Sequence, residues 1–177
     1  MSKKLTPPVN EKDHVQGDAH AAIELVEYGD YQCPHCGRAY PIIKRIQKKM
    51  GKDLKFIFRN FPLSEMHPQA FTAAVATEAA ARQNAFWEMH DIVFEHQDDL
   101  EPAGLVSYAK HLKLDMAKFL KDMEDNQLVE KVESDFDSGV RSGVNGTPTF
   151  FINGHRYDGT WEETQFLEYL QEVLAAG

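Results

Sequence analysis

The sequence predicts an α/β fold that carries an inserted all-helical subdomain. Three observations support this: a strand–helix–strand unit at residues 23–61, a block from residue 68 to about 139 with little strand signal, and a return of strand signal at residue 146. A length of 177 residues favours one domain. We therefore expect a polar N-terminal tail at residues 1–18, a domain at 19–177 and a helical insertion at about 66–142.

The first unit contains two strands and a helix. Residues 23–28 are rich in β-branched and aromatic side chains, which is typical of a strand. Residues 33–50 are predicted to form a helix, because Pro34 suits a first turn and isoleucines then recur on one face. Pro41 lies inside this helix and should kink it. Residues 54–61, dense in Phe and Ile, predict the second strand.

The middle block is predicted to form four or five helices, because its apolar residues recur at helical spacing. The helical groups are Phe71, Val75 and Ala79; Phe86, Met89, His90 and Val93; and Val129, Val132, Phe136 and Val140. The expected breaks or caps are Asn84, Pro102, Asp115 and Asn126.

The last part of the chain is predicted to form a hairpin and a helix. Residues 146–152 read as a strand that runs into the tight-turn pair Asn153-Gly154, and residues 155–157 begin the return strand. Thr160 followed by Glu163 fits a capping box, so we expect the final helix to begin there.

Composition and charge exclude some classes of function. The chain carries 28 acidic and 19 basic residues, for a net charge of −9, which argues against a general surface for nucleic acid or anionic membranes. No run approaches the roughly 20 apolar residues of a membrane span. We therefore expect neither nucleic-acid binding nor membrane insertion.

The N-terminal residues bear on the compartment. Polar and proline residues follow Met1 where a signal peptide would need an apolar run, so the chain as written is expected to be cytoplasmic. The alternative is a mature exported protein of the bacterial periplasm or cell envelope that carries a new start methionine.

Cys33-Pro34-His35-Cys36 is the motif most indicative of chemistry. These are the only two cysteines of the chain, and their spacing places both on the first turn of a helix. A disulfide across so short a loop would stabilise the fold poorly, so a redox role is favoured over a structural one. The unpaired N–H groups at the helix start favour a thiolate at Cys33, whereas Cys36 lies one turn further in.

Together these features resemble the DsbA-like thiol–disulfide oxidoreductases, which have a thioredoxin fold with a helical insertion. The resemblance covers roughly residues 20–175 and rests on four matches. They are the cysteine motif between a strand and a helix, Pro41 five residues after the second cysteine, the Gly146–Phe150 segment, and the Asn153-Gly154 turn. It implies that the Thr147–Pro148 bond is cis and that an extended substrate pairs with this edge.

The resemblance also implies roles for the site residues. Cys33 would attack or be attacked first, and Cys36 would resolve the mixed disulfide. His35 would stabilise the Cys33 thiolate, and that stabilisation favours donation of a disulfide. Glu27 matches a buried acid of the family that relays the proton of Cys36. The alternatives are that His35 is a solvent-exposed residue and that Glu27 is a solvated strand-end carboxylate.

Other functions remain open from the sequence alone. A reductant or stress-responsive thiol exchanger would use the same two cysteines in a reducing cytosol. A zinc module would need ligands besides Cys33 and Cys36, and a second cysteine pair is missing. A chaperone on the same fold would work without the cysteines. We expect no cofactor and no metal, and we expect His67, His90 and His96 to be packed or surface residues.

The expected partners follow from this reading. They are cysteine-containing protein substrates and a redox partner that resets the Cys33–Cys36 pair. We expect a monomer. A disulfide isomerase is less expected, because the family's isomerases resemble this domain joined to a dimerisation region that has no counterpart in the sequence.

Overall fold

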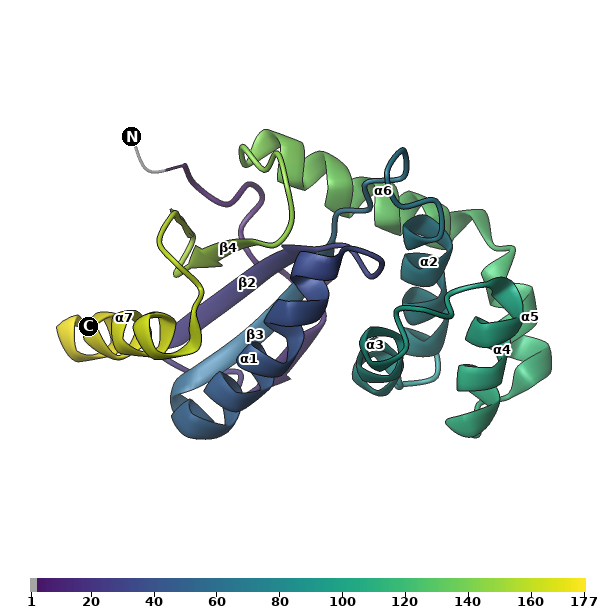
Figure 1. Cartoon of the computed structure of the whole chain (residues 1–177), viewed down its shortest axis with the longest axis horizontal. Helices are drawn as coiled ribbons and strands as arrows, with labels where there is room; N and C mark the ends of the chain where they lie inside the picture. The colour runs from purple at the N-terminus through teal and green to yellow at the C-terminus, as the bar shows by residue number, and fades with distance from the viewer. Residues whose placement is uncertain (1–2) are drawn as a thin grey trace.

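The architecture was obtained from a computed structural model, which describes residues 3–177. A five-stranded sheet has the order β1-β3-β2-β4-β5, and helices pack on it and beside it (Figure 1). The strands are β1 (Val15–Gly17), β2 (Ile23–Gly29), β3 (Leu54–Asn60), β4 (Thr149–Ile152) and β5 (His155–Tyr157). The helices are α1 (Pro34–Met50), the short 3-10 helix η1 (Gly51–Asp53), α2 (Ala70–Ala81), α3 (Phe86–Glu95), α4 (Pro102–His111), α5 (Met116–Met123), α6 (Asn126–Arg141) and α7 (Glu163–Ala176).

The two faces of the sheet are covered by different elements. Strands β2 and β3 run parallel and form its centre, and β4 pairs antiparallel with β2. Because side chains alternate along a strand, Leu25 packs in the cluster that α1 and α7 cover, whereas Val26 packs in the cluster that contains Leu5 and Phe61. Helices α2 to α6 form the insertion, of which α2 to α5 stand beside the sheet (Figure 1). The C-terminal half of α6 packs on the sheet face that contains Tyr28 and Phe61. This mixed α/β arrangement confirms the expected fold class.

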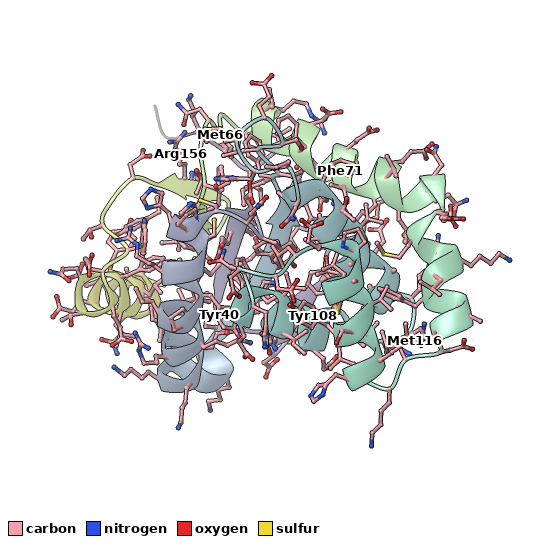
Figure 2. The ribbon with its side chains drawn as sticks, turned by 45° about the vertical axis from the view of Figure 1, so that its right-hand side comes forward. Tyr40, Met66, Phe71, Tyr108, Met116 and Arg156 are labelled. Carbon is pink, nitrogen blue, oxygen red and sulfur yellow. The ribbon has the colours of Figure 1, made fainter. Side chains whose placement is uncertain are left out.

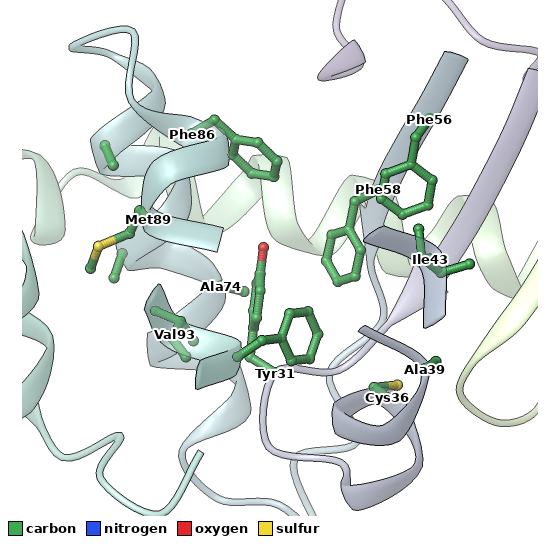
Figure 3. Packing of buried hydrophobic residues seen from close by; sticks show 14 of the residues in the cluster. Tyr31, Cys36, Ala39, Ile43, Phe56, Phe58, Ala74, Phe86, Met89 and Val93 are labelled. Atoms are coloured by element: carbon green, nitrogen blue, oxygen red, sulfur yellow. The ribbon is translucent and has the colours of Figure 1, made fainter. Parts of the chain in front are cut away.

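Aromatic packing joins the insertion to the sheet. Tyr31 is 1% exposed and packs against Phe58 of β3, with ring centroids 5.0 Å apart (Figure 3). Its ring centroid lies 4.8 Å from that of Phe94 of α3. Tyr40 of α1 stacks on Phe94 at 5.3 Å, on the side of α1 that faces the insertion (Figure 2). The insertion and the start of α1 therefore share one core.

The expectation of a polar tail up to residue 18 is wrong for much of that segment. Residues 15–17 form β1, which pairs antiparallel with β3. Leu5 is 5% exposed and packs in the core. Asp13 accepts two hydrogen bonds of 2.8 Å from Arg59, whose guanidinium is buried and needs a carboxylate partner. The segment is therefore part of the folded domain.

Two further expectations need correction. Helix α7 begins at Glu163 with Glu162 as its N-cap, and Thr160 Oγ1 instead accepts from the N–H of Glu162, at 3.2 Å. The buried face of α6 contains Ser138 and Gly139, whereas Val140 is 56% exposed. Ser138 is drawn inward because its hydroxyl lies 2.7 Å from the Tyr28 hydroxyl.

Candidate active site at the start of helix α1

The two cysteines lie where the chain passes from β2 into α1. Cys33 is the N-cap of α1, and Pro34 occupies the first turn, where no N–H is needed. Both thiols are free. Cys36 is fully buried, whereas Cys33 retains 3% exposure, so an incoming sulfur atom can reach only Cys33.

The surroundings of Cys33 favour its thiolate. The pKa of Cys33 is lowered to about 5, chiefly by a hydrogen bond from the Cys36 thiol. Burial opposes this effect, while the Thr147 side chain and the backbone N–H groups of Cys36 and His35 add to it. Cys33 is therefore ionised at neutral pH, as a nucleophile or leaving group in disulfide exchange must be.

Cys36 behaves in the opposite way. Burial raises the pKa of the Cys36 thiol well above its ordinary value, and the hydrogen bond that it donates to Cys33 and the charge of Glu27 raise it further. The backbone N–H of Asp30 lies 3.5 Å from Cys36 Sγ and partly offsets these effects. Cys36 therefore stays protonated while Cys33 beside it is a thiolate.

Glu27 is a buried acid next to the cysteine pair. Its side chain follows Leu25 on the face of β2 that α1 covers, and the residue is 3% exposed. Oε2 is buried without a hydrogen-bond partner among the described residues. Burial, followed by the charge of Cys33, raises the pKa of Glu27 to about 8. At neutral pH the Glu27 carboxyl group is thus mostly protonated, and a small rise in pH would ionise it.

His35 contributes differently from the expectation. Its ring is exposed, and Nδ1 lies 2.9 Å from Nη2 of Arg38, which can only donate. The group of His35 that lowers the pKa of Cys33 is its backbone N–H. A role for the imidazole in stabilising the thiolate remains a prediction, whereas the backbone contribution follows from the helix start itself.

The Thr147–Pro148 peptide bond is cis and immediately precedes β4. The carbonyl oxygen of Thr147 lies 3.8 Å from Cys33 Sγ, so it can accept the hydrogen of the neutral thiol. The Thr147 hydroxyl is buried and has no other partner among residues 3–177, which leaves it available to a thiolate. The loop therefore touches the reactive sulfur directly.

Three residues that the sequence analysis did not assign to the site also hold it. Asp30 is 1% exposed, and its carboxylate accepts from the backbone N–H of Cys33 at 3.1 Å. His67, from the loop before α2, lies 2.9 Å from the same carboxylate. Gln97, from the loop after α3, donates to the carbonyl oxygens of Tyr31 and Cys33, at 2.9 Å each. An Asp three residues before a helix-start cysteine is the only one of these signals visible in sequence.

The other two histidines singled out in the sequence have structural contacts. His90 is buried, with Nδ1 2.9 Å from the Tyr31 hydroxyl, and burial lowers its pKa so that it stays neutral. His96 contacts the carbonyl oxygen of Ile92 at 2.8 Å. Within the described part of the chain, no group of three or more His, Cys, Asp or Glu side chains is arranged to hold a metal ion.

A family model described as thioredoxin matches residues 9–172. The chain belongs to the thioredoxin family. Among solved structures, BdbD from Bacillus subtilis in its oxidised form is 26% identical to this chain, covers 99% of it and 98% of its own length, and has a TM-score of 0.86. The alpha-DsbA1 of Wolbachia pipientis is 22% identical with a TM-score of 0.84, over 97% of this chain and 95% of that one. These similarities confirm the resemblance to DsbA-like proteins and the thioredoxin-like fold with its helical insertion.

Curated relatives match this thioredoxin domain as a part of longer proteins. The Na(+)/H(+) antiporter NhaA 3 of Salinispora tropica is 41% identical over 157 residues, which are 89% of this chain and 24% of the relative. The Na(+)/H(+) antiporter NhaA 1 of Mycobacterium sp. (strain KMS) is 41% identical over 170 residues, 94% of this chain and 28% of the relative. The chain spans about a quarter of the length of these relatives. Among residues 3–177, no helix is both long and apolar enough to cross a bilayer.

Proposed function

We propose that this thioredoxin domain is a thiol–disulfide oxidoreductase that donates its disulfide to cysteine-containing proteins. The observation that carries the proposal is the asymmetry of the pair: Cys33 is held as a thiolate at the start of α1, and Cys36 stays protonated behind it. Stabilising the reduced thiolate makes the disulfide easier to reduce, and therefore a stronger oxidant.

Donation of the disulfide takes two exchange steps. A substrate thiolate attacks Cys33 Sγ of the disulfide form, the bond to Cys36 breaks, and Cys36 leaves and takes up a proton, for which the Glu27 carboxyl is the neighbouring source. A second substrate thiolate then attacks the substrate sulfur of the mixed disulfide, and Cys33 leaves as a thiolate. The substrate loses two electrons, and the protein ends in its reduced form, with Cys33 as a thiolate and Cys36 as a thiol. A leaving group with a low pKa departs faster, which favours this direction.

Backbone pairing would place the substrate. The Thr147–Pro148 loop lies against Cys33 and leads into β4, so an extended segment that pairs beside Thr147 would bring its own cysteine to Cys33. A redox partner would then reoxidise the pair. The same site would act as a reductant in a reducing compartment, so the direction depends on the potential as well as on the partner.

Titration of the Cys33–Cys36 pair in glutathione buffers tests the proposal. We expect a potential well above about −200 mV, and a value near about −270 mV, as in thioredoxin, would contradict disulfide donation. Cys33→Ala should abolish exchange with a dithiol peptide. Retained turnover in that variant would contradict the assignment of Cys33, whichever direction the potential favours.

A further inference from the structure

The carboxylate of Asp30 is buried at the centre of the turn that leads from β2 into α1. Its side chain is 0% exposed, and its two oxygens face different parts of the molecule. Oδ1 accepts from the backbone N–H groups of Gln32 and Cys33, at 2.7 and 3.1 Å. Oδ2 accepts from the backbone N–H of Leu63 and contacts His67 Nδ1, at 2.9 Å each. One carboxylate therefore links the cysteine turn to the loop that opens the insertion.

Asp30 contacts both cysteines through its other groups as well. Its carbonyl oxygen accepts from the N–H of Cys33 at 3.1 Å, and its own N–H lies 3.5 Å from Cys36 Sγ. A shift of Asp30 would therefore change the position of Cys33 and the hydrogen bond to Cys36 together. The geometry of the pair depends on where Asp30 is held.

His67 holds Asp30 from the side of the insertion. The side chain of His67 is 16% exposed. The backbone N–H of His67 donates to the carbonyl oxygen of Leu63 at 2.8 Å, which closes the loop between these residues. A carboxylate accepts but does not donate, so Nδ1 of His67 carries the hydrogen in this contact. Without the His67 contact, Oδ2 would keep only the Leu63 N–H as a donor, in a site that water does not reach. A buried carboxylate oxygen that loses a hydrogen bond is costly, so we expect the Asp30 side chain to shift towards another donor.

Resting on the thiol chemistry proposed above, we propose that Asp30, held in place by His67, is a positioning residue that sets the reactivity of Cys33. The thiolate is favoured by N–H groups of the first helical turn, and these act only while they point at Sγ. Asp30 aligns that turn by fixing the N–H of Cys33. The insertion therefore controls the thiol through one hydrogen bond from His67, and neither Asp30 nor His67 needs to touch the substrate.

Two neutral substitutions of His67 differ in where they place a hydrogen-bond donor and not in their charge. In His67→Asn the amide nitrogen stands at the same number of bonds from Cα as Nδ1, so it can donate to Asp30. In His67→Gln the amide nitrogen stands one bond further out, with the same charge and polarity. The same change at His111, an exposed residue at the end of α4, serves as the control.

The ionisation of Cys33 is measured from its alkylation rate against pH, in the Cys36→Ala background and in the intact pair. We expect His67→Gln to lower the ionisation constant of Cys33 about two- to fivefold, the range by which first-turn N–H groups favour an anion. The glutathione equilibrium constant of the intact pair should change by the same factor. His67→Asn and His111→Gln should match the parent protein.

The proposal is overturned if His67→Gln leaves both constants unchanged, or if His67→Asn is impaired as much as His67→Gln. A lower melting temperature with unchanged constants likewise shows that the contact is only structural. If the His67 variants do not fold, a measurement on the unsubstituted protein still tests the proposal. The Nδ1–H resonance of His67 should shift as Cys33 titrates. The shift should be absent in Cys33→Ser. If the unsubstituted protein exchanges no disulfides at all, the proposed function fails, and the Cys33 ionisation data still decide the role of His67.

Discussion

At the scale of single residues, Cys33 and Glu27 differ because of the hydrogen bonds that each receives. Both are nearly buried, and burial alone disfavours the charged form of either. Cys33 is offered the Cys36 thiol, the Thr147 side chain and two backbone N–H groups, and its pKa falls to about 5. Glu27 Oε2 has no donor within the described residues, and its pKa rises to about 8.

The first prediction concerns the pH dependence of Cys33. Because the pKa is lowered to about 5, its alkylation rate should rise between pH 4 and 6 and stay level at neutral pH, as expected around that pKa. Stopped-flow alkylation of the reduced protein measures this profile. A rate that keeps rising to about pH 9, as for an ordinary thiol, would contradict the thiolate assignment.

The second prediction concerns Glu27 as a proton carrier. Glu27→Gln keeps the size of the side chain but cannot give a proton to Cys36 as it leaves, so formation of the Cys33 mixed disulfide from the disulfide form should slow by about 100-fold, the low end for a positioned acid or base. Rapid acid quenching and mass spectrometry follow the intermediate. Glu24→Gln is the matched control on the same strand, where the acid pairs with Lys55 at 3.4 Å. Equal rates of mixed-disulfide formation in the two variants would remove Glu27 from proton transfer.

At the scale of elements, the N-terminal segment is fastened to β3 by a buried ion pair. Arg59 of β3 is 2% exposed and bonds to Asp13 and to the carbonyl oxygens of Pro7 and Pro8. Burial alone would raise the pKa of Asp13, but hydrogen bonds and the charge of Arg59 outweigh it and lower the pKa. The contribution of Asp13 to folding is therefore present above its ordinary pKa of 3.8 and is lost as pH falls through the lowered value.

The third prediction is that Asp13→Ala destabilises the fold by about 3 kcal/mol, because it leaves the Arg59 charge buried and unpaired. Urea unfolding measures the change. Asp158→Ala removes the same kind of partner from Arg156, but Asp158 is 75% exposed, so its cost should stay below about 0.5 kcal/mol. Similar costs for the two variants would show that the N-terminal segment adds little to stability.

Local sequence patterns were sufficient to predict most helices and strands. They failed where a contact with a residue far along the chain determines which side chain is buried. The Ile23–Gly29 strand follows from its β-branched and aromatic residues, and the Pro34–Met50 helix follows from Pro34 and from isoleucines that recur on one face. The inward face of α6 depends on Tyr28, which lies 110 positions from Ser138 and bonds to it. The link between Asp30 and His67 spans 37 positions, and a His before a proline gives no sign of its partner.

The difference between local patterns and long-range contacts also explains which parts of the site could be predicted from the sequence. The cysteine motif and the Thr147–Pro148 pair could be singled out because residue type and spacing carry their chemistry. The burial of Glu27 could not, because it depends on α1 covering that face of the sheet. The ring of His35 meets Arg38 three residues on, which helical spacing allows but does not require.

At the scale of the whole molecule, the acidity of Cys33 links redox state to stability. A group whose pKa is lower in the folded state than in the unfolded state stabilises the fold above its unfolded pKa and loses that effect as pH falls through the folded value. For Cys33 this pH window runs from the ordinary thiol pKa of 9.0 down to the lowered pKa of about 5. The disulfide form has no such group and lacks this dependence.

The fourth prediction follows from that window. Relative to the disulfide form, the reduced protein should lose about 2 to 3 kcal/mol of stability between pH 7 and pH 4, at 1.36 kcal/mol per pKa unit. Parallel denaturant titrations of the two forms measure the difference. A gap that does not change with pH would mean that Cys33 ionises alike in the folded and unfolded chains.

The N-terminal segment also limits where another chain can join the sheet. It begins beside β5, where Lys4 forms a bridge with His155 and Leu5 bonds to the carbonyl oxygen of Gly154, and it ends as β1 against β3. This one segment thus covers the outer side of β5 and of β3, at the two edges of the sheet. Uncovered sheet edges are the places where strands of other chains can pair and aggregate. A substrate that pairs with the backbone, as proposed above, would then have the Thr147–Pro148 loop open to it rather than these edges.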